Sequence, residues 1–139
     1  MTIRILCVGK IKEAFYRDAI AELMKRMGRY ATTEVIEVAE EKAPEGLSQA
    51  EKEQILANEG KKLTSEAFAA HIRTAMLAGK SRIVFIIGSS FGLHPSVKRR
   101  ADMLLSFSDM TFPHQLFRVM LAEQIYRAFK INNNEPYHK

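Results

Sequence analysis

The sequence has one cysteine and no tryptophan among its 139 residues, and its apolar runs are short. A single cysteine excludes an intrachain disulfide, and the position of Cys7 inside the apolar run IRILCVG is typical of a small buried strand residue. No stretch approaches the roughly 18 apolar residues of a membrane span, and IRILCVG is too short for the core of a signal peptide. We therefore expect a soluble protein that stays in the reducing cytoplasm.

Acidic residues are in the minority. The chain contains 21 Lys and Arg against 16 Asp and Glu, which gives a formal net charge of +5 and a pI of about 9.4. Such a balance is compatible with an anionic partner such as a nucleic acid, but it does not identify one. With 47% hydrophobic residues the chain is long enough to bury one core. We predict a single domain over residues 1–139.

Short apolar runs and helical patterns alternate along the chain. We predict strands at residues 3–8, 34–38 and 83–87, and helices at residues 12–27, 48–58 and 65–78, with further helices starting near His94 and His114. Ser48 and Glu51 form a capping box for the second helix, while Gly28 and Gly79 are expected helix stops. This alternation predicts an α/β fold with a mostly parallel sheet, helices on both faces, and ligands beyond the carboxyl ends of the strands.

Two segments follow the strong apolar strand at 83–87. Gly88 and Gly92 stand four residues apart, where glycine permits either a plain turn or the close approach of a ligand to the backbone. Residues 105–112 alternate apolar and polar side chains up to Pro113, which ends strand pairing, so we expect an edge strand there.

His71 has no second ligand at metal spacing, and no metal site is predicted.

The helix after Pro113 has an unusually broad apolar face. At about 100° per residue this face contains Phe117, Leu121, Ile125, Tyr126, Ala128 and Phe129, with Glu123, Arg127 and Lys130 opposite. Arg118 falls inside the apolar face. A buried cation needs a partner, so Arg118 must meet a carboxylate, backbone carbonyls, a second subunit or a ligand. The breadth of the face also predicts a homodimer.

Two further groups have an ordinary and a functional interpretation. The tail 132–139 either frays, as chain ends do, or is ordered, so that Tyr137 stacks on a base and His138 accepts a hydrogen bond or a proton near neutral pH. Lys98, Arg99 and Arg100 are candidate RNA contacts, and a solvated helix face explains them equally well.

Three segments together resemble one known family. They are IVFIIGSSFG at 83–92, SFSDMTFPHQ at 106–115 and YRAFKINNNEPYHK at 126–139, and they are similar to the C-terminal half of the ribosomal large subunit methyltransferase H family. The stretches IRILCVGKIKEAFYRDAIAE and EVIEVAEEKAPEGLS resemble the start of the same family. The resemblance covers almost the whole chain.

The resemblance implies a SPOUT methyltransferase with a C-terminal trefoil knot, acting as a homodimer on 23S rRNA within the ribosome. The implied reaction is S-adenosylmethionine-dependent methylation of N3 of a pseudouridine in helix 69, without a metal. The implied cofactor site consists of Gly88, Phe107, Ser108, Asp109, Met110, Thr111 and Phe112. Arg118, Tyr137 and His138 match the positions expected for catalysis: His138 or Tyr137 as the base, and Arg118 to stabilise the anionic nucleobase.

The chain departs from the family pattern at two points. Ser89 stands where the family usually has a second glycine, and about twenty residues are missing at Gly60/Lys61. The missing segment comprises the end of a helix and an apolar strand that supplies one wall of the cofactor pocket. Its loss predicts that the helices at 48–59 and 65–78 are fused or joined too tightly. The alternative function is therefore a noncatalytic RNA- or ribosome-binding module that has lost cofactor binding.

Overall fold

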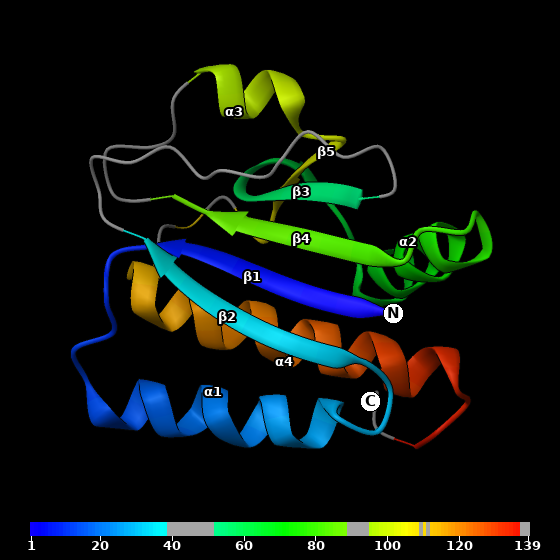
Figure 1. The fold of residues 1–139 in the computed structure, drawn as a ribbon, viewed down its shortest axis with the longest axis horizontal. Helices are drawn as coiled ribbons and strands as arrows, with labels where there is room; N and C mark the ends of the chain where they lie inside the picture. Colours follow the sequence, from blue (N-terminus) through cyan, green and yellow to red (C-terminus); the bar gives the residue numbers. More distant parts are fainter. Residues whose placement is uncertain (39–51, 89–94, 109, 111, 137–139) are drawn as a thin grey trace.

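The structure, a computed structural model, is a parallel sheet with helices on both faces (Figure 1). The described residues are 1–38, 52–88, 95–108, 110 and 112–136. The strands are β1 (Thr2–Val8), β2 (Thr32–Val38), β3 (Lys52–Lys62), β4 (Arg82–Ile87) and β5 (Met103–Ser106). The helices are α1 (Ala14–Met27), α2 (Ser65–Leu77), α3 (Pro95–Arg100) and α4 (His114–Asn132). In the described part of the chain, none of the helices has the length and apolar character that a membrane-spanning segment needs.

The five strands lie in the order β2-β1-β4-β3-β5, and all four ladders between them are parallel. The ladders place Glu37, Cys7, Ile87, Ala57 and Leu105 side by side in one row across the sheet. The five strands end shortly after this row, all at the same edge of the sheet, which we call the carboxyl edge. The loops that follow the strands therefore begin close to one another.

The hydrophobic core lies between the sheet and three helices. Alternate residues of β1, including Ile3 and Ile5, pack with α1, α2 and α4 on one face of the sheet, together with Phe85 of β4. The opposite face has a smaller cluster in which Val97 of α3 packs on Leu6, Val84 and Ile86. Because both faces are covered, β1 and β4 are apolar almost throughout, as expected of buried parallel strands.

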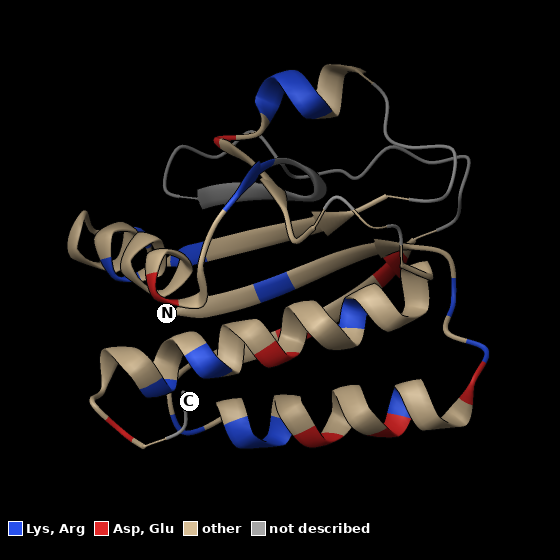
Figure 2. Ribbon diagram, turned by 180° about the vertical axis from the view of Figure 1, so that it is seen from behind, with Lys and Arg blue, Asp and Glu red and all other residues tan. Residues whose placement is uncertain are grey.

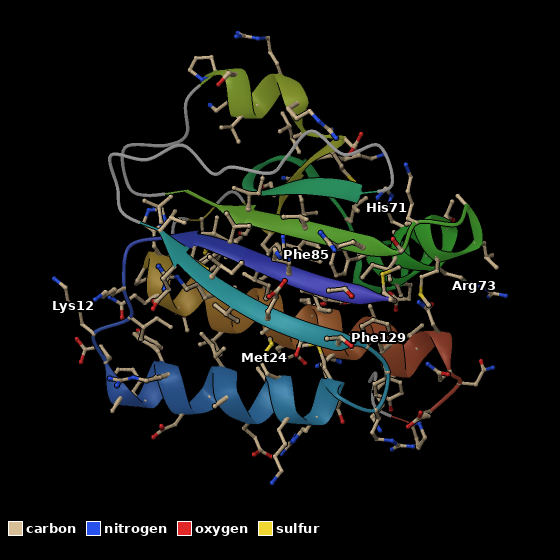
Figure 3. All side chains as sticks on the ribbon, viewed as in Figure 1. Lys12, Met24, His71, Arg73, Phe85 and Phe129 are labelled. Atoms are coloured by element: carbon tan, nitrogen blue, oxygen red, sulfur yellow. The ribbon has the colours of Figure 1, made fainter. Side chains whose placement is uncertain are left out.

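Figure 3 shows Met24 of α1 pointing toward the sheet and α4, while Lys12, in the loop before α1, extends away from the body of the protein. On the inner side of α1, Ile20, Leu23 and Met27 are buried. On α4 the predicted apolar face is confirmed in full, and all six of its residues are buried.

Helix α2 ends in a hydrogen-bonded motif with a left-handed glycine. After α2, the N–H of Gly79 donates to the carbonyl of Met76 and the N–H of Lys80 to that of Ala75, both at 3.1 Å. Gly79 has φ of +84°, a left-handed conformation that glycine adopts without steric cost, so the expected stop at this residue is confirmed. Gly28 caps α1 instead with an ordinary φ of −56°.

The predicted helix at 48–58 is wrong where it can be compared, because residues 52–62 form β3 between β4 and β5. Helical preference amounts to less than about 1 kcal/mol per residue. Each buried backbone group left without a hydrogen bond costs about 1–3 kcal/mol. A helix here would leave one side of β4 and of β5 unpaired, so the sheet decides the conformation. The capping pair Ser48 and Glu51 lies outside the described residues.

The expectation of fused helices is therefore also wrong, because a strand precedes α2 and fills the position between β4 and β5. A register shift between Ala57 and Lys61 keeps β3 paired with β5. The edge strand expected at 105–112 is mostly wrong. β5 does lie at the edge of the sheet, but it spans Met103–Ser106 and shares only Leu105 and Ser106 with the predicted range. After it, Ser106 Oγ donates to the carbonyl of Ser108 at 3.1 Å.

Cys7 offers a simple test of the core. Burial raises the pKa of its thiol from 9.0 to about 11, although the nearby Arg118 acts in the opposite direction. Only the thiolate reacts with iodoacetamide, so we expect negligible alkylation of the folded protein at pH 8 and rapid alkylation in urea. Mass spectrometry measures both rates on a single thiol. Equal rates in the two solvents would contradict the buried position.

Candidate active site

Several predicted site residues come together at the carboxyl edge. Cys7 pairs with Ile87, so Gly9 and Gly88 leave neighbouring strands at the same edge, and residues 107–112 leave β5 there as well. The strand order changes direction between β1 and β4, and ligands in open α/β sheets bind at such switch points. The sheet thus brings the carboxyl ends of β1, β4 and β5, from which the predicted cofactor loops start, to one edge.

Arg118 joins α4 to this edge. Its Nη1 donates to Glu37 Oε2 at 2.8 Å, and its Nη2 donates to the carbonyl oxygens of Val8 at 3.0 Å and Gly9 at 2.8 Å. Its side chain is 3% exposed. The sequence required a partner for this cation, and the structure provides a carboxylate and two backbone carbonyls. Among the described residues Arg118 Nε has no hydrogen-bond partner.

Glu37 organises the loop between β1 and α1. The same Oε2 atom that pairs with Arg118 accepts a hydrogen bond from the N–H of Ile11 at 2.7 Å. Close by in sequence, the N–H of Lys12 donates to Oε1 of Gln115, in the first turn of α4. Gly9 adopts φ of +90° where Arg118 approaches the backbone. These contacts hold the start of α4 against the carboxyl end of β1.

A pocket of about 260 Å³ lies between the residues after β5, the start of α2 and the middle of α4. Its apolar lining consists of Leu63, Phe68, Leu105, Phe107, Phe112 and Met120, and its polar lining of Thr64, Ser65, Ser108 and Gln124. Ser65 Oγ donates to Gln124 Oε1 at 2.8 Å. The volume is close to the lower end, about 300 Å³, of common ligand pockets. Aromatic walls with a few polar groups suit a flat heterocycle.

Only some of the predicted cofactor residues line this pocket. Phe107, Ser108 and Phe112 line this pocket, and the ring of Phe107 lies 4.8 Å from that of Phe117, the neighbour of Arg118. Met110 is 76% exposed, and its N–H donates to Ser108 Oγ at 3.0 Å. Gly88 is buried at the end of β4 and does not line the pocket. Asp109 and Thr111 lie outside the described residues.

Sequence reasoning predicted three of the ten residues that line the pocket and missed the other seven. Met120 and Gln124 are one turn apart on α4, beside rather than within its apolar face, and Thr64 and Ser65 begin α2. The helix start was visible in the sequence, since Thr64 Oγ1 accepts a hydrogen bond from the N–H of Ala67 as an N-cap. Nothing in the sequence connected this cap to the residues after β5.

The tail and Arg118 lie at opposite ends of α4. The helix rises about 1.5 Å per residue, so Asn132 lies about 21 Å along the axis from Arg118. Beyond it, Glu135 contacts Tyr30 and Lys130 at the far end of the helix. The predicted catalytic residues Tyr137 and His138 lie outside the described residues.

Basic side chains gather on α3, where Lys98, Arg99 and Arg100 occupy its last turn (Figure 2). Their role as RNA contacts stays a prediction.

His71 is half-buried on α2. Within the described ranges, no three His, Cys, Asp or Glu side chains are grouped so that they would hold a metal ion.

Comparison with known proteins decides the family. Residues 1–138 match the family described as "Predicted SPOUT methyltransferase". The chain belongs to this family. The fold is also similar to that of a solved structure, a probable methylase family protein from Haemophilus influenzae Rd KW20, with a TM-score of 0.62 and 13% identity. That match covers 99% of this chain and 70% of the other, and it supports the fold alone.

Curated relatives of this SPOUT methyltransferase carry a more specific name. The chain is 52% identical to the ribosomal RNA large subunit methyltransferase H of Bifidobacterium adolescentis and 54% identical to that of Bifidobacterium animalis subsp. lactis. It is 48% identical to the protein of the same name from Exiguobacterium sibiricum. Each match covers 100% of both chains, so the family resemblance drawn from the sequence is confirmed.

The same alignments bear on the missing segment. They extend over 159 positions, whereas this chain has 139 residues, so at least 20 positions have no residue of this chain. The shortage of about twenty residues relative to the family is thereby confirmed. In the structure, β3 nevertheless occupies a place in the sheet, and the residues that follow it line the pocket.

Proposed function

We propose that this SPOUT methyltransferase transfers a methyl group from S-adenosylmethionine to N3 of a pseudouridine in helix 69 of 23S rRNA. It acts on the ribosome in the cytoplasm, as a homodimer. The names of relatives that match over the full length support ribosomal RNA as the substrate. The formal net charge of +5 favours the approach of an RNA backbone.

The pocket at the start of α2 carries the proposal. Three of the residues expected to hold the cofactor line it, and the residues following β3 supply another wall. A strand between β4 and β5 and a pocket wall after it are therefore present in this chain, although it is shorter than its relatives. The aromatic rings suit the adenine of S-adenosylmethionine, and Ser65, Ser108 and Gln124 offer polar groups for the nucleoside.

The reaction needs a base and a compensating charge. The N3–methyl bond forms as the bond between the methyl carbon and the donor sulfur breaks, and that electron pair remains on sulfur. When bound, S-adenosylmethionine supplies the electrophilic methyl group. The N3 proton passes to His138 or Tyr137. Arg118 is assigned the stabilisation of the anionic nucleobase, with Glu37 as the counter-charge that helps to fix its side chain at the carboxyl edge.

The distance along α4 leads us to assign these roles to two subunits. Arg118 lies at the start of the helix, and Glu135 anchors the tail at the other end. In a homodimer, the tail of one subunit would therefore complete the site of its partner. Symmetric dimers exchange such contributions reciprocally, which gives two equivalent composite sites.

A noncatalytic RNA-binding module is the second candidate. The positions missing relative to the curated relatives favour it, because a pocket that lost a wall would bind RNA without binding the methyl donor. Both candidates predict RNA affinity that weakens with salt, so binding of the donor distinguishes them.

Calorimetric titration with S-adenosylmethionine tests the proposal. We expect micromolar affinity for the wild-type chain, verified by intact mass. Phe107→Ala should weaken binding about tenfold, because stacking of an aromatic ring on a nucleobase is worth about 1–3 kcal/mol. Phe15→Ala is the matched control, since Phe15 is 64% exposed on α1 and does not line the pocket. Absence of binding by the intact chain would favour the RNA-binding module.

A further inference from the structure

One carboxylate ties the end of α4 to the loop after α1. The two oxygens of Glu135 lie 2.8 and 2.9 Å from the Tyr30 hydroxyl, and Lys130 Nζ donates to Oε2 at 2.7 Å. Arg29 Nη1 approaches the same Oε2 at 3.8 Å. We call Arg29, Tyr30, Lys130 and Glu135 the Glu135 clip. It connects residues 105 apart in the sequence.

The backbone fixes the same residue a second time. Asn134 has φ of +56°, its N–H donates to the carbonyl of Ile131 at 3.1 Å, and the N–H of Glu135 donates to that of Lys130 at 2.9 Å. This is the helix-ending motif also found after α2, with asparagine at the left-handed position. Both the main chain and the side chain of Glu135 are thus held, and they set the direction in which the tail continues.

The ring of Tyr30 is fixed independently of its hydroxyl. It stacks on Phe129 of α4 with 5.6 Å between centroids and 3° between planes. The guanidinium of Arg29 lies 5.4 Å from the centre of the Tyr30 ring. Tyr30→Phe therefore removes the contact with Glu135 and leaves the packing of the ring in place.

The clip keeps its charges through neutral pH. The hydrogen bond from Lys130, followed by that from Tyr30, lowers the pKa of Glu135, so this carboxylate stays ionised down to acidic pH. The same contact with Glu135 raises the pKa of Lys130 to about 12. Stabilisation by this ion pair is therefore fully present between the usual Glu pKa and the usual Lys pKa. It is lost at acidic pH, when Glu135 becomes protonated, and at strongly alkaline pH, when Lys130 loses its proton near its pKa of about 12.

We propose that Glu135 and Tyr30 are positioning residues for methyl transfer. They determine where the tail leaves the protein, and Tyr137 and His138 follow Glu135 by two and three residues. A catalytic group displaced by about 1 Å can lose a hundredfold in rate, so a fixed starting point this close to His138 matters for the reaction. This inference rests on the proposed function.

Kinetics of Tyr30→Phe and Glu135→Gln test the inference. We expect kcat to fall about tenfold in each variant, while the affinity for S-adenosylmethionine remains that of the wild type and the thermal midpoint falls only slightly, because the clip is partly exposed. Glu22→Gln is the matched control. It removes a carboxylate that pairs with Arg26 at 3.0 Å on the exposed side of α1, and it should not change kcat. A wild-type kcat in both clip variants would overturn the inference.

A double-mutant cycle separates positioning from a general structural effect. If the clip acts through the tail, Tyr30→Phe should have no further effect on kcat when His138 is already alanine. A tenfold loss that persists in the His138→Ala background would overturn the positioning role.

A measurement that does not depend on methyl transfer distinguishes this inference from the proposed function. Heteronuclear NMR relaxation of the Asn134 and Glu135 amides should show rigid backbone in the wild type and increased picosecond motion in Glu135→Gln. Rigid amides in a wild-type protein that transfers no methyl group would contradict the proposed function alone. Equal motion in wild type and Glu135→Gln would contradict the clip itself.

Discussion

Glu37→Ala is expected to lower the free energy of unfolding by about 3 kcal/mol. The substitution leaves Arg118 with a buried positive charge and only backbone carbonyls as partners, and breaking a buried ion pair costs about 3–5 kcal/mol. We expect the lower end of this range because the Glu37 side chain is 35% exposed, which allows water to reach the vacated position. Urea denaturation followed by circular dichroism measures the change.

Glu34→Ala provides the matched control for this prediction. Glu34 lies on the same strand and also pairs with an arginine, but Arg4 and Glu34 are 24% and 41% exposed. Exposed ion pairs contribute less than about 1 kcal/mol, so this variant should unfold close to the wild type. Similar losses in both variants would mean that burial of Arg118 is not the source of the effect.

His138→Ala is expected to reduce methyl transfer by about 10²–10⁴-fold, the usual contribution of a general base. Tyr137→Phe and Arg118→Ala should also be slow. Transfer of the radiolabelled methyl group to ribosomes measures all three, and near-normal rates throughout would reject the assigned roles.

Mixed dimers test whether the tail serves the partner's site. Phe107→Ala weakens donor binding about tenfold and His138→Ala impairs the tail. At donor concentrations well below the wild-type Kd, the first homodimer should therefore keep about a tenth of the wild-type activity and the second almost none. Random mixing should restore about a quarter of the wild-type sites, because half of the dimers are then heterodimers with one intact composite site each. A mixture no more active than its components would show that pocket and tail must belong to the same chain.

Elements with strong periodicity were predictable from the sequence. The face of α4 recurs at helical spacing over 19 residues, and the five apolar residues of β4 leave little choice of structure. Local signals of this kind depend on neighbours within a few residues. The family was also recognisable, because the segments around Gly88, Pro113 and Tyr137 are specific in combination.

The segment at 52–62 was not predictable in the same way. It contains glutamate, lysine, alanine and leucine, which favour a helix, and its capping signal also pointed to one. Its conformation is decided by β4 and β5, which offer backbone hydrogen bonds from both sides and come later in the sequence. A preference of tenths of a kcal/mol per residue is outweighed by that pairing.

By itself, the sequence determined the class of fold, most helices and strands, the family, and the need of Arg118 for a partner. Only the tertiary structure decided that the partner is Glu37 on β2, that the start of α2 lines a pocket with Phe107, and that Glu135 ties the tail to Tyr30. The reason is physical. Periodicity and capping act within a few residues, whereas ion pairs and pocket walls depend on which distant segments the sheet brings together.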